Sequence, residues 1–148
     1  MKRIHCIRAI SYLFFILFAY AAAVKLIDFK TFKEEMVESP LLGKFALLLT
    51  VTIPITEILI AIAVLMPRYR LKGLYASVVS MAIFTVYITI LLYYQEPVSC
   101  DCGGLLQQID LNTHLWINIG FLLLGLAGVI LYKREEKKII SITANKTH

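Results

Sequence analysis

Charged residues are scarce in this chain, and long stretches have none. Only 17% of the 148 residues are Asp, Glu, Lys or Arg, whereas 59% are hydrophobic. That balance is unlike an ordinary soluble domain of this length, so we expect a lipid bilayer to be the main solvent. The net charge of +5 does not favour nucleic-acid binding, because the basic residues stand in small groups between apolar stretches and form no single patch.

Four apolar stretches are long enough to cross a membrane. A hydrocarbon core of about 30 Å needs about 20 helical residues. The stretches cover residues 9–27, 45–66, 74–94 and 115–132, and the last two carry no charge. The sequence therefore predicts an all-α membrane protein. Its single domain is a four-transmembrane-helix bundle over residues 1–132, followed by a polar cytoplasmic tail, 133–148, that frays.

The positions of Lys and Arg predict the orientation of the bundle, because positive loops are retained in the cytoplasm. Eleven of the fifteen basic residues precede the first span, fill the second loop or follow the fourth span. We therefore expect both termini on the cytoplasmic side of a bacterial inner membrane. An alternative is that Met1–Ala23 is a cleaved signal peptide, since it has a basic start and a small-residue end; three spans would then remain.

Apolar and charged residues alternate at helical spacing between the first two spans. Phe29, Phe32, Met36 and Val37 are interleaved with Lys and Glu over residues 29–44. The pattern indicates an amphipathic helix lying on the membrane surface. Ser39-Pro40 should end it, because proline disfavours helix at the residue before it.

The third loop contains Cys100 and Cys102, one residue apart, on the side expected to be outside and oxidising. A disulfide between them closes only a small, strained ring. Such a bond is better suited to thiol–disulfide exchange than to stabilising the fold. The alternatives are an incidental structural disulfide or two free thiols. Zinc is not favoured, since two thiolates leave a tetrahedral site half empty. Cys6 lies a membrane thickness away, so electrons would have to pass to a thioredoxin-like protein or a quinone.

Glu57 is an acid inside the second span, one turn after Pro54. It lies roughly 18 Å from the outer end of that span by helical rise. An acid at that depth should face the bundle interior, and desolvation should favour its neutral form. The same depth count suggests Ser11, Tyr12, Ser80 or Thr85 as its partner. Its role is either a structural hydrogen bond or a quinone, proton or ligand site.

Three further residues stand near the outer surface. Lys25 and Asp28, three residues apart at the end of the first span, favour a pair of salt-bridged interfacial anchors. Alternatively they stand near the cysteine loop, where Lys25 would stabilise a thiolate or an acidic headgroup. His114 fits an interfacial residue beside Trp116.

Together these features resemble the MauE/DoxX-like redox-associated membrane proteins, and the MauE branch is the closer match. The resemblance covers roughly residues 9–132. It is carried by Lys25, Asp28 and Phe32, by Pro54 and Glu57, by Asn118, and by Cys100-Asp-Cys102-Gly-Gly. The usual loop is closer to Cys-Gly-Cys-Phe-Gly, so Asp101 and Gly103 are departures. A carboxylate beside the thiols disfavours the thiolate and slows its attack.

The resemblance implies a membrane accessory protein, with thioredoxin-like partners, that supports disulfide formation or reduction in exported proteins. In methylamine utilisation, MauE is associated with maturation of the disulfide-rich small subunit of methylamine dehydrogenase. Such a protein would be a component of a thiol-disulfide oxidoreductase. Two alternatives stay open: a quinone-binding electron-transfer subunit built around Glu57, as in the DoxX relatives, and a non-catalytic scaffold that recruits a partner through residues 29–44.

Overall fold

The computed structural model describes residues 2–39, 42–94 and 111–145, and all regular structure in these ranges is helical. The helices are α1 (Lys2–Ile27), α2 (Phe29–Glu38), the short 3₁₀ helix η1 (Gly43–Phe45), α3 (Ala46–Leu65), α4 (Arg70–Tyr94) and α5 (Leu111–Asn145). Four of them are long and apolar enough to cross a membrane, over Ile4–Ile27, Gly43–Leu65, Arg70–Ile90 and Asn112–Lys138. The predicted four-span helical fold is confirmed.

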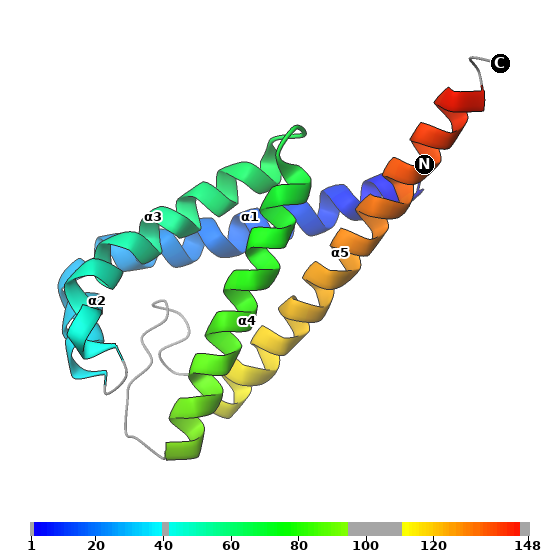
Figure 1. The fold of residues 1–148 in the computed structure, drawn as a ribbon. Helices are drawn as coiled ribbons and strands as arrows, with labels where there is room; N and C mark the ends of the chain where they lie inside the picture. Colours follow the sequence, from blue (N-terminus) through cyan, green and yellow to red (C-terminus); the bar gives the residue numbers. More distant parts are fainter. Residues whose placement is uncertain (1, 40–41, 95–110, 146–148) are drawn as a thin grey trace.

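The long helices form two antiparallel pairs. In Figure 1, α1 and α3 lie side by side as a first arm, and α4 and α5 form a second arm. The arms cross near the α3–α4 turn and separate toward the opposite end, where α2 lies at the tip of the first arm. Both chain termini lie on the side of the α3–α4 turn, so the molecule is closed at that end and open at the other.

Small residues allow the close crossing of the two arms. A Cβ atom added to Gly73 would lie 2.6 Å from the backbone nitrogen of Val64, so α3 and α4 touch backbone to backbone there. Gly125 and Gly128 let α5 lie close to side chains of the neighbouring helices, Gly125 against Val78 of α4 and Phe14 of α1, and Gly128 against Ile10 of α1. Side chains of small volume at helix contacts are typical of membrane bundles, where close packing replaces the hydrophobic effect.

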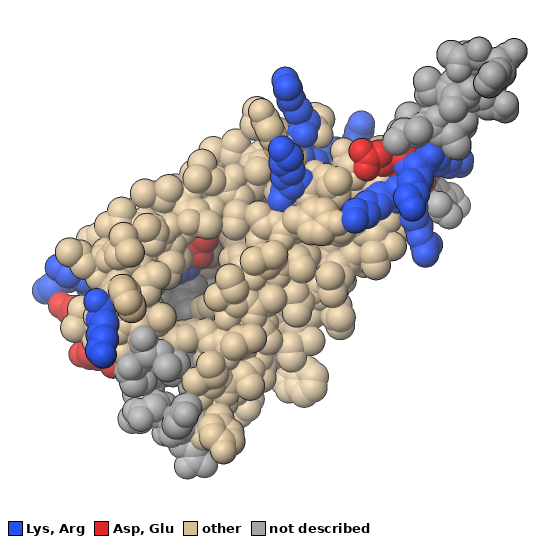
Figure 2. All heavy atoms as spheres, in the orientation of Figure 1, with Lys and Arg blue, Asp and Glu red and all other residues tan. Residues whose placement is uncertain are grey.

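The outer surface of the bundle is apolar between two charged ends. Large hydrophobic side chains on every long helix face outward, among them Ile16, Leu47, Ile83 and Leu123. Figure 2 shows Lys and Arg gathered around the termini and the α3–α4 turn, and a second, mixed group of charges around α2. A tan, uncharged belt separates them, as expected for helices whose solvent is lipid.

Two local features refine the sequence prediction. An amphipathic helix forms in the predicted segment, and α2 ends at Glu38 with Ser39 as its C-cap, as expected from Ser39-Pro40. Its apolar residues Phe32 and Met36 are covered by the first turns of α3, in a small core with Ala46. At the other end, α5 continues to Asn145, so most of the polar tail is helical and the prediction of a frayed tail was wrong.

Candidate functional site

Lys25 is buried in the last turn of α1, with only 7% of its side chain exposed. Its Nζ donates to Glu57 Oε1 at 2.8 Å and to the backbone oxygen of Ala21 at 3.3 Å. The ammonium also lies 5.7 Å from the centroid of the Phe32 ring, within the range of a cation–π interaction. One side chain therefore joins α1, α2 and α3.

Glu57 lies in the middle of α3, one turn after the buried Pro54, and its side chain is 13% exposed. One carboxylate oxygen, Oε1, is satisfied by Lys25. The other, Oε2, is buried and has no hydrogen-bond partner among the described residues. Burying a carboxylate oxygen without a donor is costly, so this atom is an acceptor with spare capacity.

The expected partners of Glu57 were wrong. Ser11 donates to the Ile7 carbonyl of its own helix, and Thr85 accepts from Asn118. Those partners were chosen by counting residues from the end of each span, on the assumption that all spans begin at the same depth in the membrane. In the structure α2 packs beside the first turns of α3, so the C-terminal end of α1 is offset along α3 and the last turn of α1 lies level with Glu57.

The expected salt bridge between Lys25 and Asp28 was also wrong. Lys25 turns inward to Glu57, whereas Asp28 Oδ1 accepts a 2.8 Å hydrogen bond from Thr31 at the start of α2. Asp28 is exposed and belongs to the connection between α1 and α2. The two residues therefore have separate surroundings despite their spacing of three.

The second arm contributes a polar wall of its own. Asn118 on α5 donates from Nδ2 to Thr85 Oγ1 at 2.8 Å and to the Met81 carbonyl at 3.3 Å, which ties α5 to α4. One turn earlier, His114 is only 6% exposed and packs against the Phe84 ring at 5.6 Å between centroids. Trp116 is 72% exposed, so the two side chains point in different directions, that of His114 into the bundle and that of Trp116 away from it.

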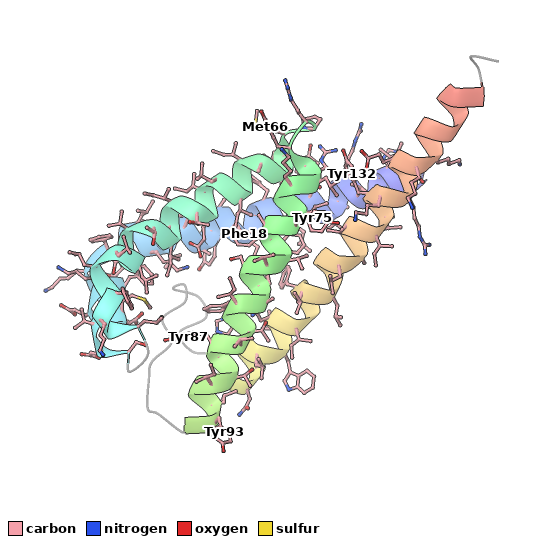
Figure 3. All side chains as sticks on the ribbon, in the orientation of Figure 1. Phe18, Met66, Tyr75, Tyr87, Tyr93 and Tyr132 are labelled. Atoms are coloured by element: carbon pink, nitrogen blue, oxygen red, sulfur yellow. The ribbon has the colours of Figure 1, made fainter. Side chains whose placement is uncertain are left out.

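A cavity of about 470 Å³ lies where the two arms separate. Figure 2 shows a hollow in the tan surface with acidic and basic atoms at its bottom. Its polar lining comes from both arms and includes Lys25, Glu57, Ser80, His114 and Asn118, while Phe18, Phe32, Phe84 and Phe121 supply aromatic surface. Tyr87, which projects from α4 on the side of α2 in Figure 3, also lines the cavity and shares a 3.0 Å hydrogen bond with Ser39.

The cysteine pair lies elsewhere in the chain. Cys100 and Cys102 fall outside the described residues, so their geometry stays a prediction. Cys6 is described, and it is a free, exposed cysteine near the start of α1. Within the described ranges, no three His, Cys, Asp or Glu side chains come together in a way that would hold a metal ion.

A splayed four-span bundle with a buried ion pair beside an apolar cavity defines a multi-pass membrane protein, and comparison with known families assigns it more closely. Residues 3–132 match the family described as methylamine utilisation protein MauE, and the chain belongs to that family. This confirms the resemblance drawn from Lys25, Pro54, Glu57 and the cysteine loop. No curated protein and no solved structure matches the chain.

Proposed function

We propose that this chain is an integral membrane accessory protein for the thiol–disulfide maturation of exported proteins, working with a thioredoxin-fold partner through Cys100 and Cys102. Membership of the MauE family is the observation that carries the proposal. The separation of charge along the bundle supports it, because the end with most Lys and Arg is the end retained in the cytoplasm of a bacterial inner membrane. The loop between Tyr94 and Leu111 would then face the oxidising side.

The proposed chemistry is thiol–disulfide exchange. The thiolate of one cysteine attacks a disulfide of the partner, forming a mixed disulfide and releasing the partner's other sulfur as a thiolate. The second cysteine then attacks the mixed disulfide, which closes the Cys100–Cys102 bond and leaves the partner reduced by two electrons. The reverse sequence oxidises the partner with the same intermediates, so the direction depends on the reduction potentials of the two pairs.

Trapping the mixed disulfide tests the proposal. Cys100→Ser and Cys102→Ser, each made in a Cys6→Ser background, leave one thiol that attacks but is never resolved. At least one of the two variants should accumulate a covalent adduct, which mass spectrometry would identify as an exported thioredoxin-fold protein. The variant without any cysteine is the matched control and should yield no adduct. Absence of an adduct from both single-cysteine variants, in cells that contain a candidate partner, would contradict the proposal.

A further inference from the structure

The closed end of the bundle carries basic residues that have no acids beside them in the sequence. Between Glu57 and Glu96 there is no Asp or Glu, so the α3–α4 turn and the whole of α4 carry positive charge only. Arg68 and Lys72 are exposed there, and neither has an acidic partner among the described residues. Figure 2 shows basic side chains projecting from the surface at this turn. A concentration of unpaired positive charge attracts an anionic partner.

Two of the three cations of this turn are available to a partner, and the third is not. Arg70 donates at 3.3 Å to the backbone carbonyls of the last two residues of α3, which have no acceptor role left within the helix. Arg68 Cζ and Lys72 Nζ each lie 6.0 Å from the centroid of the exposed Tyr69 ring. Arg70 therefore serves the fold, whereas Arg68 and Lys72 form a cluster on the surface around one aromatic ring.

A further cation joins this cluster from α5. Lys133 Nζ lies 5.3 Å from the centroid of the Tyr75 ring, and Tyr75 follows Lys72 by three residues on α4. The acids of α5, Glu135 and Glu136, come after Lys133, beyond the two tyrosine rings. Basic side chains from the turn, α4 and α5 therefore surround two tyrosines. Tyrosine and basic residues together are typical of the depth of the lipid headgroups.

The same face of α4 continues from the cluster as an exposed apolar track. After Lys72, exposed residues recur at steps of three or four: Tyr75, Val79, Ile83 and Val86. From Tyr75 to Val86 the track is roughly 16 Å long by helical rise, about half of a hydrocarbon core of about 30 Å. It thus has the depth of one lipid leaflet. A soluble anion would use the cations alone, whereas a phospholipid would use the cations and the track.

We propose that this face binds an acidic phospholipid, whose phosphodiester lies among Arg68, Lys72 and Lys133 and whose acyl chain follows the apolar track of α4. The guanidinium can donate to two phosphate oxygens at once, and the lysines bind as point charges. A lipid bound in this way ties the α3–α4 turn to the end of α5. The inference concerns lipid binding at the closed end and is independent of the cysteine chemistry.

Quenching of a single tryptophan by brominated lipids tests the proposal. The chain has one tryptophan, Trp116, so the variant Tyr69→Trp/Trp116→Phe places the only indole between Arg68 and Lys72. This full-length variant is reconstituted in phosphatidylcholine vesicles with a minor fraction of brominated phosphatidylglycerol, which is anionic, or of brominated phosphatidylcholine. Quenching should show a preference of about twentyfold for phosphatidylglycerol, since two cations contribute about fivefold each. The wild-type chain, whose Trp116 is exposed at the start of α5, is the control and should be quenched equally by both lipids.

Removing one cation from the cluster should lower this preference about fivefold, as expected for one basic residue at a charged surface. Arg68→Gln and Lys72→Gln, each made in the reporter variant, measure the loss. Lys44→Gln makes the matched change at an exposed position at the start of α3, the opposite end of the apolar belt, and should leave the preference unchanged. Arg8→Gln removes an exposed charge from α1 and should alter the preference less than either cluster variant.

Equal quenching of the reporter variant by the two brominated lipids would overturn the proposal. An equal loss from Arg8→Gln would do the same, because it would indicate diffuse attraction by the whole charged end. Loss of the preference in excess inorganic phosphate would replace the lipid site with one for a soluble anion.

If Tyr69→Trp does not fold, mass spectrometry of the wild-type chain released from mixed-lipid nanodiscs decides. The chain should retain phosphatidylglycerol over phosphatidylcholine, and Arg68→Gln/Lys72→Gln should lose this selectivity. Selectivity that survives in the double variant would contradict the site.

Discussion

Replacing Lys25 by Met should be among the most destabilising single substitutions in the bundle. Both partners of the Lys25–Glu57 pair are largely withdrawn from solvent, and among the described residues the 2.8 Å bond from Lys25 is the one hydrogen bond that the Glu57 carboxylate accepts. Without Lys25, both oxygens of Glu57 are buried and unpaired. Breaking a buried ion pair by removing one partner costs about 3–5 kcal/mol. Since methionine keeps most of the packing against Phe32, we expect a loss of about 3 kcal/mol in the free energy of unfolding.

The double variant Lys25→Met/Glu57→Met separates loss of the pair from loss of packing. A buried pair replaced by apolar side chains of similar size is often neutral, so the double variant should lie within about 1 kcal/mol of the wild type. Unfolding by SDS in mixed micelles, followed by circular dichroism, measures these differences. The exposed pair of Lys30 and Glu34, 4.0 Å apart, is the control, and Lys30→Met should cost less than about 0.5 kcal/mol. A double variant no more stable than Lys25→Met would refute this reasoning.

Three other outcomes follow from the packing and the topology. Gly73→Ala forces a Cβ against the α3 backbone and should lower the free energy of unfolding by about 1–3 kcal/mol. The control Gly120→Ala adds a Cβ that meets nothing within 4 Å and should be neutral, and the same SDS titration compares the two variants. Asn118→Leu removes the hydrogen bonds that tie α5 to α4 and should cost about 0.6–1.7 kcal/mol of stability. Thr85→Val removes one of these bonds and should cost less, so a larger effect of Thr85→Val would contradict the role of Asn118 as the donor that joins the two helices. An impermeant thiol reagent, applied to intact cells after mild reduction, should label Cys100 and Cys102 but not Cys6, and labelling that requires a breached membrane would contradict the proposed orientation.

The spans were predictable because each is a long apolar run bounded by charged or turn-forming residues. Residues 45–66 correspond to Gly43–Leu65 in the structure, and 9–27 fall within Ile4–Ile27. The amphipathic helix was predictable for a similar reason, since Phe32 and Met36 share one face at a spacing of four. Hydrophobic pattern determines such elements locally, without reference to the rest of the chain.

The Lys25–Glu57 pair was missed because it depends on how far one helix is offset along another. The hydrophobic pattern of the sequence does not give the offset of α1 along α3. In the structure it follows from α2, which packs beside the first turns of α3. One signal was present in the sequence: the first two predicted spans each contain a single charged residue, and the two charges are of opposite sign. Since a lone charge in a bilayer is costly, such a pair favours contact.

The burial of His114 also had a signal in the sequence. His114, Asn118, Phe121, Gly125 and Gly128 recur at steps of four and three, which places them along one face of α5. The structure turns this face toward the other helices, with four of the five residues buried. Proximity to Trp116 in sequence was the weaker guide, because neighbours two apart on a helix point in different directions.

Gly73 lies directly against the backbone of Val64, so this contact is the point about which a rotation of α4 relative to α3 would turn. From Gly73 to the end of α4 at Tyr94 is a lever of roughly 32 Å by helical rise. Turning that lever by about 5° would carry its far end through roughly 3 Å. A small rotation at the closed end of the bundle would therefore change the width of the open end by several times the displacement at the contact itself.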